Sequence, residues 1–189
     1  EHQTLKALQD AEVPVVRPVV LPHNTGFETL GFAEPYYFCC YKKFGGRMEQ
    51  DLAPDQLMWL GRTLGRLHNV TEHLTLHHRL PLNTNTYGDQ QLKTILDGRY
   101  VPEDLRNHLE DVLHRCLDFM EPLMSLDWHA FAVHGDCHLG NVLWDRIGPT
   151  LVDFDDMVMA PAVQDVWMLL YGTALEQAEQ KKSFLKGYE

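Results

Sequence analysis

The spacing of hydrophobic residues changes from helical to extended along the first part of the chain. Leu5 and Leu8 lie about one turn apart, which predicts a helix that starts at the first residue. The β-branched and aromatic runs at residues 13–23 and 34–44, separated by the turn-prone HNTGFETLG, predict two antiparallel strands. Together these elements indicate a small α+β unit over residues 1–44.

Helical spacing dominates from residue 45 to residue 189. Pro54 opens a helix whose apolar stripe is formed by four leucines: Leu57, Leu60, Leu64 and Leu67. Gly61 and Gly65 lie beside this stripe, and glycines there permit another helix to approach closely. The change of period after two consecutive glycines therefore predicts a second, mostly helical unit.

A loop and a long helix follow. The polar residues 71–89 have no strong period and predict a loop. From Pro102 onward the spacing predicts a helix with a buried inner face, made of Leu105, Leu109, Val112, Leu113, Cys116, Leu117 and Met120. Cys116 and Met120 are interpreted as core filler on that face.

Three short strands and further helices complete the pattern. The strands are predicted at residues 131–133, 142–144 and 151–153, with Ile147-Gly148-Pro149 turning the last two into a hairpin. After Pro161 the helical period resumes, with a break at Gly172. Trp144 and Trp167 are interpreted as core aromatic residues.

Composition and charge narrow the classes of partner. A chain of 189 residues with 44% hydrophobic content can bury a sizeable core. Its formal net charge of −11 argues against nucleic acid or an anionic membrane surface as the main partner, because both require a basic face. The four cysteines lack paired spacing, and no apolar run approaches the roughly 18 residues of a membrane span. We expect a cytoplasmic monomer with reduced thiols.

The segment AVHGDCHLGNVLWDRIGPTLVDFDD, residues 132–156, gathers five aspartates, two histidines and one asparagine. Asp136 and Asn141 precede one predicted strand, and Asp153 ends the next, so the hairpin brings three oxygen-bearing side chains to one edge. Uncompensated carboxylates there would raise one another's pKa. A hard divalent cation removes this cost, and Mg²⁺ carrying nucleotide phosphates is the candidate.

These residues resemble a known family. HGDCHLGN and VDFDD are similar to the HGDxHxGN and D-x-D signatures of the aminoglycoside phosphotransferases, relatives of the protein kinases. APAVQDVWMLL, FGGR and LGRTLGRLHNV extend the likeness over most of the chain and favour the stress response kinase A group, which are Ser/Thr protein kinases. The resemblance implies a protein-kinase-like two-lobed α+β fold, with residues 1–44 as an incomplete small lobe and residues 45–189 as a helical catalytic lobe.

The resemblance also implies roles for individual residues. Asp136 would be the catalytic base that deprotonates an acceptor hydroxyl, and Asn141 and Asp153 would hold Mg²⁺. His134, His138 and Asp165 are expected to support the loop. Glu1, at the family's interval before Val13-Pro14, would pair with the phosphate-holding lysine. ATP and a protein or small-molecule hydroxyl are the implied substrates, and the hinge for adenine is expected within residues 36–44.

Two departures from the family pattern carry consequences. No lysine lies where the phosphate-holding residue is expected, because Lys6, Lys42 and Lys43 are at other places. With helical spacing from the first residue and no start signal, the chain is interpreted as a fragment of a kinase or a truncated homologue. Asp155 stands where protein kinases have glycine, and few residues separate it from Pro161, so regulation by a long activation loop is not expected.

Other interpretations of the same residues stay open at this point. The acidic hairpin could be a turn-rich structure in which Asp and Asn merely cap loops. Cys137 with two neighbouring histidines could imitate a zinc site or a Cys-His nucleophile. A third cluster, His73, His77 and His78, suggests metal but lies in a polar loop. The chain could also be a small-molecule kinase or a non-catalytic kinase-like binding module.

Overall fold

The computed structural model describes residues 1–23, 25–98 and 100–189. Within these residues the helices are α1 (His2–Asp10), α2 (Pro54–Thr71), α3 (Gln90–Asp97), α4 (Glu103–Met124), α5 (Val163–Val166) and α6 (Ala174–Tyr188). The strands are β1 (Gly31–Ala33), β2 (Tyr36–Phe38), β3 (Arg47–Met48), β4 (Phe131–Val133), β5 (Val142–Trp144), β6 (Pro149–Leu151) and β7 (Val158–Ala160). One π-helical turn, Asn85–Asp89, and two 3₁₀ turns, Leu139–Asn141 and Trp167–Leu169, complete the fold.

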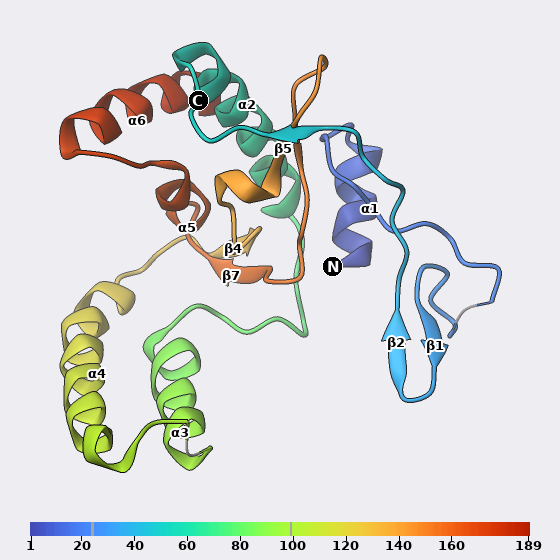
Figure 1. Cartoon of the computed structure of the whole chain (residues 1–189). Coiled ribbons are helices and arrows are strands. Elements are labelled where there is room, and N and C mark those ends of the chain that lie inside the picture. The colour runs from blue at the N-terminus through green and yellow to red at the C-terminus, as the bar shows by residue number, and fades with distance from the viewer. Residues whose placement is uncertain (24, 99) are drawn as a thin grey trace.

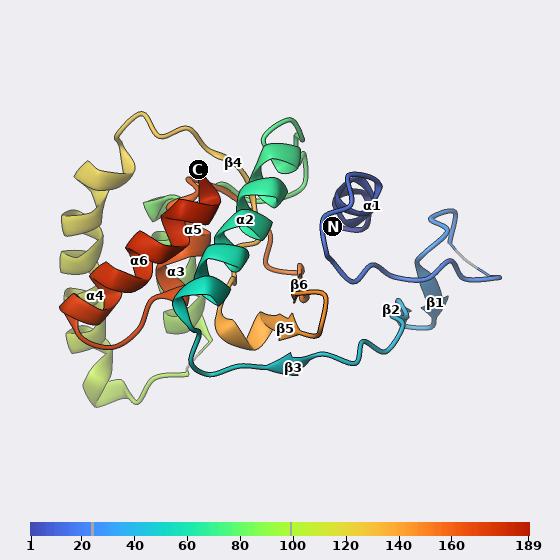
Figure 2. The same cartoon turned by 90° about the horizontal axis from the view of Figure 1, so that it is seen from above.

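The strands of the described residues form three small antiparallel sheets, one of which contains the predicted hairpin. β1 pairs with β2, β3 pairs with β5 and β5 with β6, and β4 pairs with β7. In Figure 1 the β1–β2 hairpin stands apart on one side, and β4 and β7 lie at the centre below α2. Figure 2 shows α1 beside the β5–β6 hairpin, with the β1–β2 pair beyond it. This arrangement agrees with the predicted α+β class.

The core lies where α2 packs along α6 and over the central strands. All four leucines of the predicted α2 stripe are buried, so the helical spacing identified the inner face correctly. Leu5 and Leu8 of α1 are also buried in this core, as is Phe184 of α6. Burial of such side chains removes about 1.5–3 kcal/mol each of unfavourable hydration.

The α2 and α6 backbones touch through glycine. A Cβ atom added to Gly61 would lie 2.1 Å from the Phe184 carbonyl oxygen, and one added to Gly187 would lie 1.8 Å from the Met58 carbonyl oxygen. Backbone atoms cannot step aside as a flexible side chain can, so any larger residue forces the two helices apart.

We expect Gly61→Ala to lower the free energy of unfolding by about 1–3 kcal/mol, the usual cost of overpacking a core. A loss of stability is informative here, because alanine in place of glycine would stabilise a helix without such contacts by about 1 kcal/mol. Thermal unfolding followed by circular dichroism measures the change. Gly45→Ala is the control, because its added Cβ meets no atom within 4 Å. A Gly61→Ala protein that melts at or above the unaltered protein would contradict this packing.

Proline explains why the first predicted strand is irregular. Residues 13–23 form only isolated pairings, Val15 with Leu151 and Pro18 with Tyr41. Pro14, Pro18 and Pro22 lack an N–H donor, so a continuous ladder cannot form there. The hairpin partner of β2 is instead β1, which begins at the end of the predicted turn.

The predicted catalytic hairpin is present, with a shift in its second strand. β6 covers residues 149–151 because Val142 pairs with Leu151 and Trp144 with Pro149. Asp153 therefore follows the strand by two residues, whereas the sequence placed it at the strand's end. β7 was not predicted; it pairs with β4 in register from Phe131–Ala160 to Val133–Val158.

The prediction of a buried face on α4 was wrong. The helix forms over Glu103–Met124, but none of its residues is buried. Figure 1 shows α3 and α4 side by side and extending away from the central strands, which explains the exposure. Among its apolar residues Leu105 is 50% exposed and Met120 36%, and Cys116 is exposed as well. Trp167 is 58% exposed, so its core assignment was also wrong, whereas Trp144 is buried. Among the described residues, no helix is long and apolar enough to cross a membrane.

Candidate active site

Asp165 anchors the loop that follows β4. Its side chain is fully buried, and both carboxylate oxygens accept backbone hydrogen bonds from that loop: the His134 N–H at 2.8 Å and the Gly135 N–H at 2.8 Å. His68 of α2 donates from Nε2 to the same carboxylate at 2.9 Å. One buried carboxylate on α5 therefore fixes the start of the predicted catalytic loop.

The bend at Gly135 is possible only for glycine. Its φ is +89°, and a Cβ atom would lie 2.0 Å from the Asp156 carbonyl oxygen. The Gly135 carbonyl accepts a hydrogen bond from Gln164 Nε2 at 3.1 Å. Because Gly135 lies against the Asp156 carbonyl, the loop after β4 contacts the loop before β7.

His134, in the loop after β4, also contacts the loop before β7. Its ring is fully buried, lies tilted against Phe154 with 4.4 Å between the ring centroids, and donates from Nε2 to the Val152 carbonyl at 2.8 Å. The ring nitrogen Nδ1 is buried without a hydrogen-bond partner among the described residues. His134 is therefore enclosed by protein, and its side chain contacts the segment that carries Asp153.

Asp136, Asn141 and His138 form a connected group on the loop. Asn141 donates from Nδ2 to the Asp136 carbonyl at 2.9 Å and to Asp136 Oδ2 at 3.3 Å. His138 Nε2 lies 3.5 Å from the same Oδ2, while its Nδ1 accepts the Gly140 N–H. The side chain of Asp136 is 38% exposed, so its carboxylate is held in place yet open to a substrate.

Asp153 adopts a left-handed backbone conformation, with φ +66°. Aspartate tolerates this region better than most residues, although it costs about 1–2 kcal/mol. The turn buries Phe154 in the core and leaves Asp153 and Asp155 exposed at the surface of the site. A hydrogen bond shared with Asp155, then partial burial and repulsion from Asp155, raises the pKa of Asp153.

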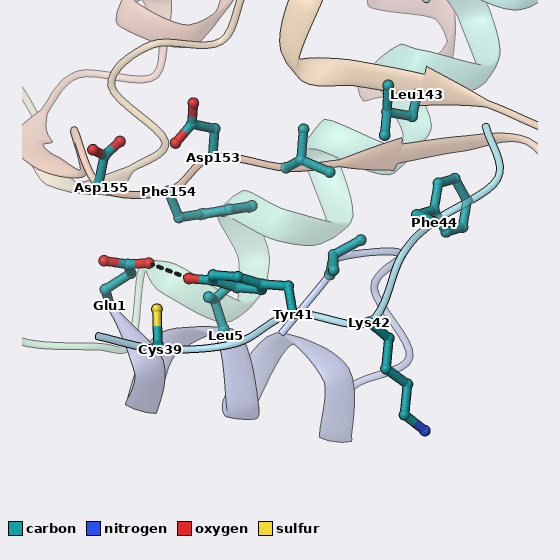
Figure 3. Close-up of a pocket in the computed structure, with 12 residues that line it drawn as sticks. Glu1, Leu5, Cys39, Tyr41, Lys42, Phe44, Leu143, Asp153, Phe154 and Asp155 are labelled. Atoms are coloured by element: carbon teal, nitrogen blue, oxygen red, sulfur yellow. Dashed lines mark hydrogen bonds between the residues drawn. The ribbon is translucent and has the colours of Figure 1, made fainter. Parts of the chain in front are cut away.

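A cavity of about 520 Å³ opens beside Asp153. Figure 3 shows Tyr41, Cys39 and Leu5 on one side of it and Phe154, Asp153 and Asp155 on the other. Its volume is within the usual range of about 300–1,000 Å³ for small-molecule sites. The predicted hinge residues therefore face the predicted metal ligand across this space.

Glu1 reaches the same cavity. Its Oε1 accepts a hydrogen bond from the Tyr41 hydroxyl at 3.0 Å (Figure 3) and its Oε2 lies 3.7 Å from Arg79 Nη2. Lys42 lies at the cavity rim with its ammonium group directed away from Asp153 (Figure 3). Lys6 pairs instead with Asp10 on the exposed face of α1.

The donor set fits Mg²⁺ bound together with phosphates. Asn141 uses its amide nitrogen for Asp136, which leaves the Oδ1 oxygen for a cation. A cation would also lower the raised pKa of Asp153. Mg²⁺ commonly takes only one or two carboxylates and completes its shell with phosphates and water. Among the described residues, no three His, Cys, Asp or Glu side chains gather closely enough to hold a metal by themselves.

The sequence profile of the phosphotransferase enzyme family, APH, matches residues 1–189. The chain belongs to this family. Stress response kinase A of Escherichia coli strain K12 is 35% identical over all 189 residues. The serine/threonine protein kinase RdoA of Salmonella typhimurium strain LT2 is 32% identical over the same length. The chain spans 56% of each of these curated relatives.

Solved structures confirm that the fold is that of the APH family. Amicoumacin kinase hAmiN, in complex with AMP-PNP, Ca²⁺ and Ami, superposes with a TM-score of 0.76 at 22% identity, over 99% of this chain and 59% of that one. Spectinomycin phosphotransferase APH(9)-Ia, in complex with ADP and spectinomycin, gives 0.69 at 17% identity over 98% and 62%. The expected kinase-like α+β fold is thereby confirmed.

The competing interpretations of this APH-family site fit less well. Cys137 is fully buried, and burial, with repulsion from Asp165 and Asp136, raises its pKa well above the usual value. A thiol held protonated is a poor nucleophile and a poor zinc ligand. His73, His77 and His78 are all exposed on the polar loop.

Sequence reasoning missed two contributors to the site. His68 was treated only as part of a family motif, although it bridges Asp165 to the Tyr188 hydroxyl, 2.6 Å from its Nδ1. Burial, then repulsion from Asp165 and Glu72, raises the pKa of Tyr188, so its phenol stays protonated and can donate to His68. Arg79 was missed because nothing in the sequence of a polar loop distinguishes an arginine that contacts other residues from one that is solvated. The helical period could have found His68, since it follows Leu64 by one turn.

Proposed function

We propose that this protein is an ATP- and Mg²⁺-dependent phosphotransferase that phosphorylates a hydroxyl group, and that the acceptor is a serine or threonine of a protein. The observation that carries the proposal is the convergence of Asp136, Asn141 and Asp153. Asn141 Nδ2 donates to the Asp136 backbone carbonyl at 2.9 Å. The Asn141 backbone carbonyl in turn accepts the N–H of Val152, the neighbour of Asp153, at 3.1 Å.

Each residue has a distinct task in this mechanism. Asn141 Oδ1 and the Asp153 carboxylate would hold Mg²⁺, which when bound would offset the negative charge of the ATP phosphates. Asp136 orients the acceptor hydroxyl and takes its proton as the new O–P bond forms. The bond from the γ-phosphorus to the bridging oxygen breaks, and ADP leaves with that oxygen. His138 and Asn141 keep the Asp136 carboxylate in place.

We assign residues 1–44 to a small lobe with the hinge and residues 45–189 to the large lobe. The lining of the cavity supports this division, since Cys39 and Tyr41 come from the first part and Leu143 and Asp153 from the second. Adenine is placed against the apolar end at Phe44 and Leu143 (Figure 3). Glu1 would then stand beside the phosphates and pair with a lysine.

The names of the relatives favour a protein acceptor, because they are called stress response kinase A and serine/threonine protein kinase RdoA. A small-molecule acceptor is the second candidate, favoured by the structures that share the fold, which are complexes with Ami and with spectinomycin. Phosphate transfer from labelled ATP distinguishes them: incorporation into a Ser/Thr peptide library supports the first, and incorporation only into spectinomycin-like or other small alcohols supports the second.

The metal assignment is tested by calorimetric titration of ATP, with Mg²⁺ and with EDTA, into the protein as its gene encodes it. We expect Mg²⁺ to strengthen binding, and Asp153→Asn to weaken MgATP binding on the order of tenfold or more, as loss of metal-site groups usually does. Asparagine also tolerates a positive φ, so the backbone turn is retained. Asp118→Asn removes an exposed carboxylate on α4 as the matched control.

Either contrary outcome is informative. If Asp153→Asn binds MgATP as tightly as the unaltered protein, Asp153 is not a metal ligand. If no variant and no metal condition gives nucleotide binding, the phosphotransferase proposal fails and a non-catalytic binding module is left.

A further inference from the structure

Arg79 has a fixed position beside the Asp153–Asp156 loop. The residues that follow it run along β7: Met159 donates to the Leu80 carbonyl at 3.4 Å, and Leu82 donates to the Met159 carbonyl at 2.9 Å. Pro81 pairs with Met159 in parallel orientation. Because β7 begins two residues after the loop ends, this pairing ties the backbone around Arg79 to the far side of the loop.

The guanidinium group of Arg79 joins two elements. Nη1 donates to the backbone carbonyl of Asp155, and Nη2 lies 3.7 Å from Glu1 Oε2. The other oxygen of Glu1 accepts the Tyr41 hydroxyl (Figure 3). A continuous set of polar contacts therefore runs from Tyr41, in the segment predicted as the hinge, through Glu1 at the start of α1, to the loop that carries Asp153.

The side chain is suited to this connection. Only 29% of it is exposed, so water competes less for its donors than at an open surface. A guanidinium presents five N–H donors in a rigid plane and stays charged, and it can serve a carbonyl and a carboxylate together. A lysine ammonium could keep the charge but would not hold both groups in one plane.

We propose that Arg79 is a positioning residue that fixes the Asp153–Asp156 loop through the Asp155 carbonyl and couples this loop to Glu1. The proposal rests on the proposed function for its consequence in catalysis. Holding the peptide after Asp155 limits the directions open to the Asp153 carboxylate, so the metal ligand is oriented before nucleotide arrives. Glu1 in turn is held toward the cavity by both Tyr41 and Arg79.

Hydrogen–deuterium exchange without metal or nucleotide tests this directly. In Arg79→Met we expect the amides of residues 154–157 to exchange on the order of tenfold faster, because a charged hydrogen bond to the loop is lost. Exchange in α2 and α6 should not change. Arg66→Met is the matched control, since Arg66 also donates to backbone carbonyls, those of Ala11 and Glu12, but away from the loop.

A second measurement follows the consequence for phosphotransfer. In Arg79→Met the Mg²⁺ concentration for half-maximal rate should rise on the order of tenfold, with kcat at saturating Mg²⁺ and ATP changed less. Arg79→Lys should restore part of the loop protection and part of the Mg²⁺ affinity, because it can serve only one of the two partners.

The outcomes separate this proposal from the proposed function. Unchanged exchange at residues 154–157 in Arg79→Met would overturn the positioning role, whatever the activity. If Arg79→Lys restored loop protection and Mg²⁺ affinity in full, the two-partner geometry would be overturned, and the positive charge alone would explain the role of residue 79. An unaltered protein that transfers no phosphate would overturn the proposed function, while the exchange result would still decide the role of Arg79.

Discussion

Replacing Asp136 with asparagine is expected to lower kcat for phosphotransfer by roughly 10²–10⁴-fold, the usual contribution of a general base. Asparagine has nearly the same shape and keeps an oxygen for the Asn141 amide, now 3.3 Å from Asp136 Oδ2. It cannot take the acceptor's proton. Since the carboxylate is partly exposed and outside the core, the free energy of unfolding should change by less than about 0.5 kcal/mol.

The rate is measured with labelled ATP at saturating Mg²⁺, and folding by thermal denaturation of the same samples. Asp127→Asn, which removes an exposed carboxylate shortly after α4, should keep full activity. Retained turnover in Asp136→Asn would remove the base role from this residue. A large fall in melting temperature would instead mean that the carboxylate is part of the framework.

Replacing Asp165 with alanine is expected to be the most destabilising single change at the site. Three N–H donors, from His134, Gly135 and His68, would lose their common acceptor in a region closed to water. Breaking a buried pair of this kind costs about 3–5 kcal/mol. This is a large share of the roughly 5–15 kcal/mol that holds a domain of ordinary size together.

Asp145→Ala provides the matched control for Asp165→Ala. Its carboxylate also accepts two backbone N–H groups, from Ile147 at 2.7 Å and Gly148 at 3.2 Å, but it is exposed. Water can replace it there, so we expect a loss below about 1.5 kcal/mol, the net value of ordinary hydrogen bonds. Denaturant titration of both variants measures the difference. Similar losses in the two would mean that burial of Asp165 does not matter.

Much of the fold could be predicted because burial imposes a period on the sequence. The α2 stripe was identified correctly because its leucines recur at every third or fourth position and all of them face the core. The period says nothing about how far a helix stands from the core, which is why the apolar face of α4 was wrongly assigned to the interior. The prolines at positions 14, 18 and 22 lack the N–H groups that a continuous strand needs. Their effect on the first predicted strand depends on which of its N–H groups the neighbouring strand would have to bind.

The candidate site was predictable where its residues are adjacent in sequence. His134, Asp136, Asn141 and Asp153 all lie within 20 residues of one another, on the β5–β6 hairpin or the loops that flank it, and local spacing places them together. Their long-range partners could not be found in this way: Arg79 lies 76 residues from Asp155 and Tyr188 lies 120 residues from His68. Each pairing depends on packing between elements that no local pattern describes. The roles of the site residues remain predictions until the variants above are measured.

The contact between His68 and the Tyr188 hydroxyl has a practical consequence for handling the protein. Tyr188 is the last residue of α6. Removing this tyrosine would leave His68 without its phenol partner, and His68 in turn bonds to the Asp165 carboxylate that anchors the predicted catalytic loop. A truncation placed before Tyr188 would therefore disturb the candidate site from a distance, and mass spectrometry of the protein should accompany every rate measurement.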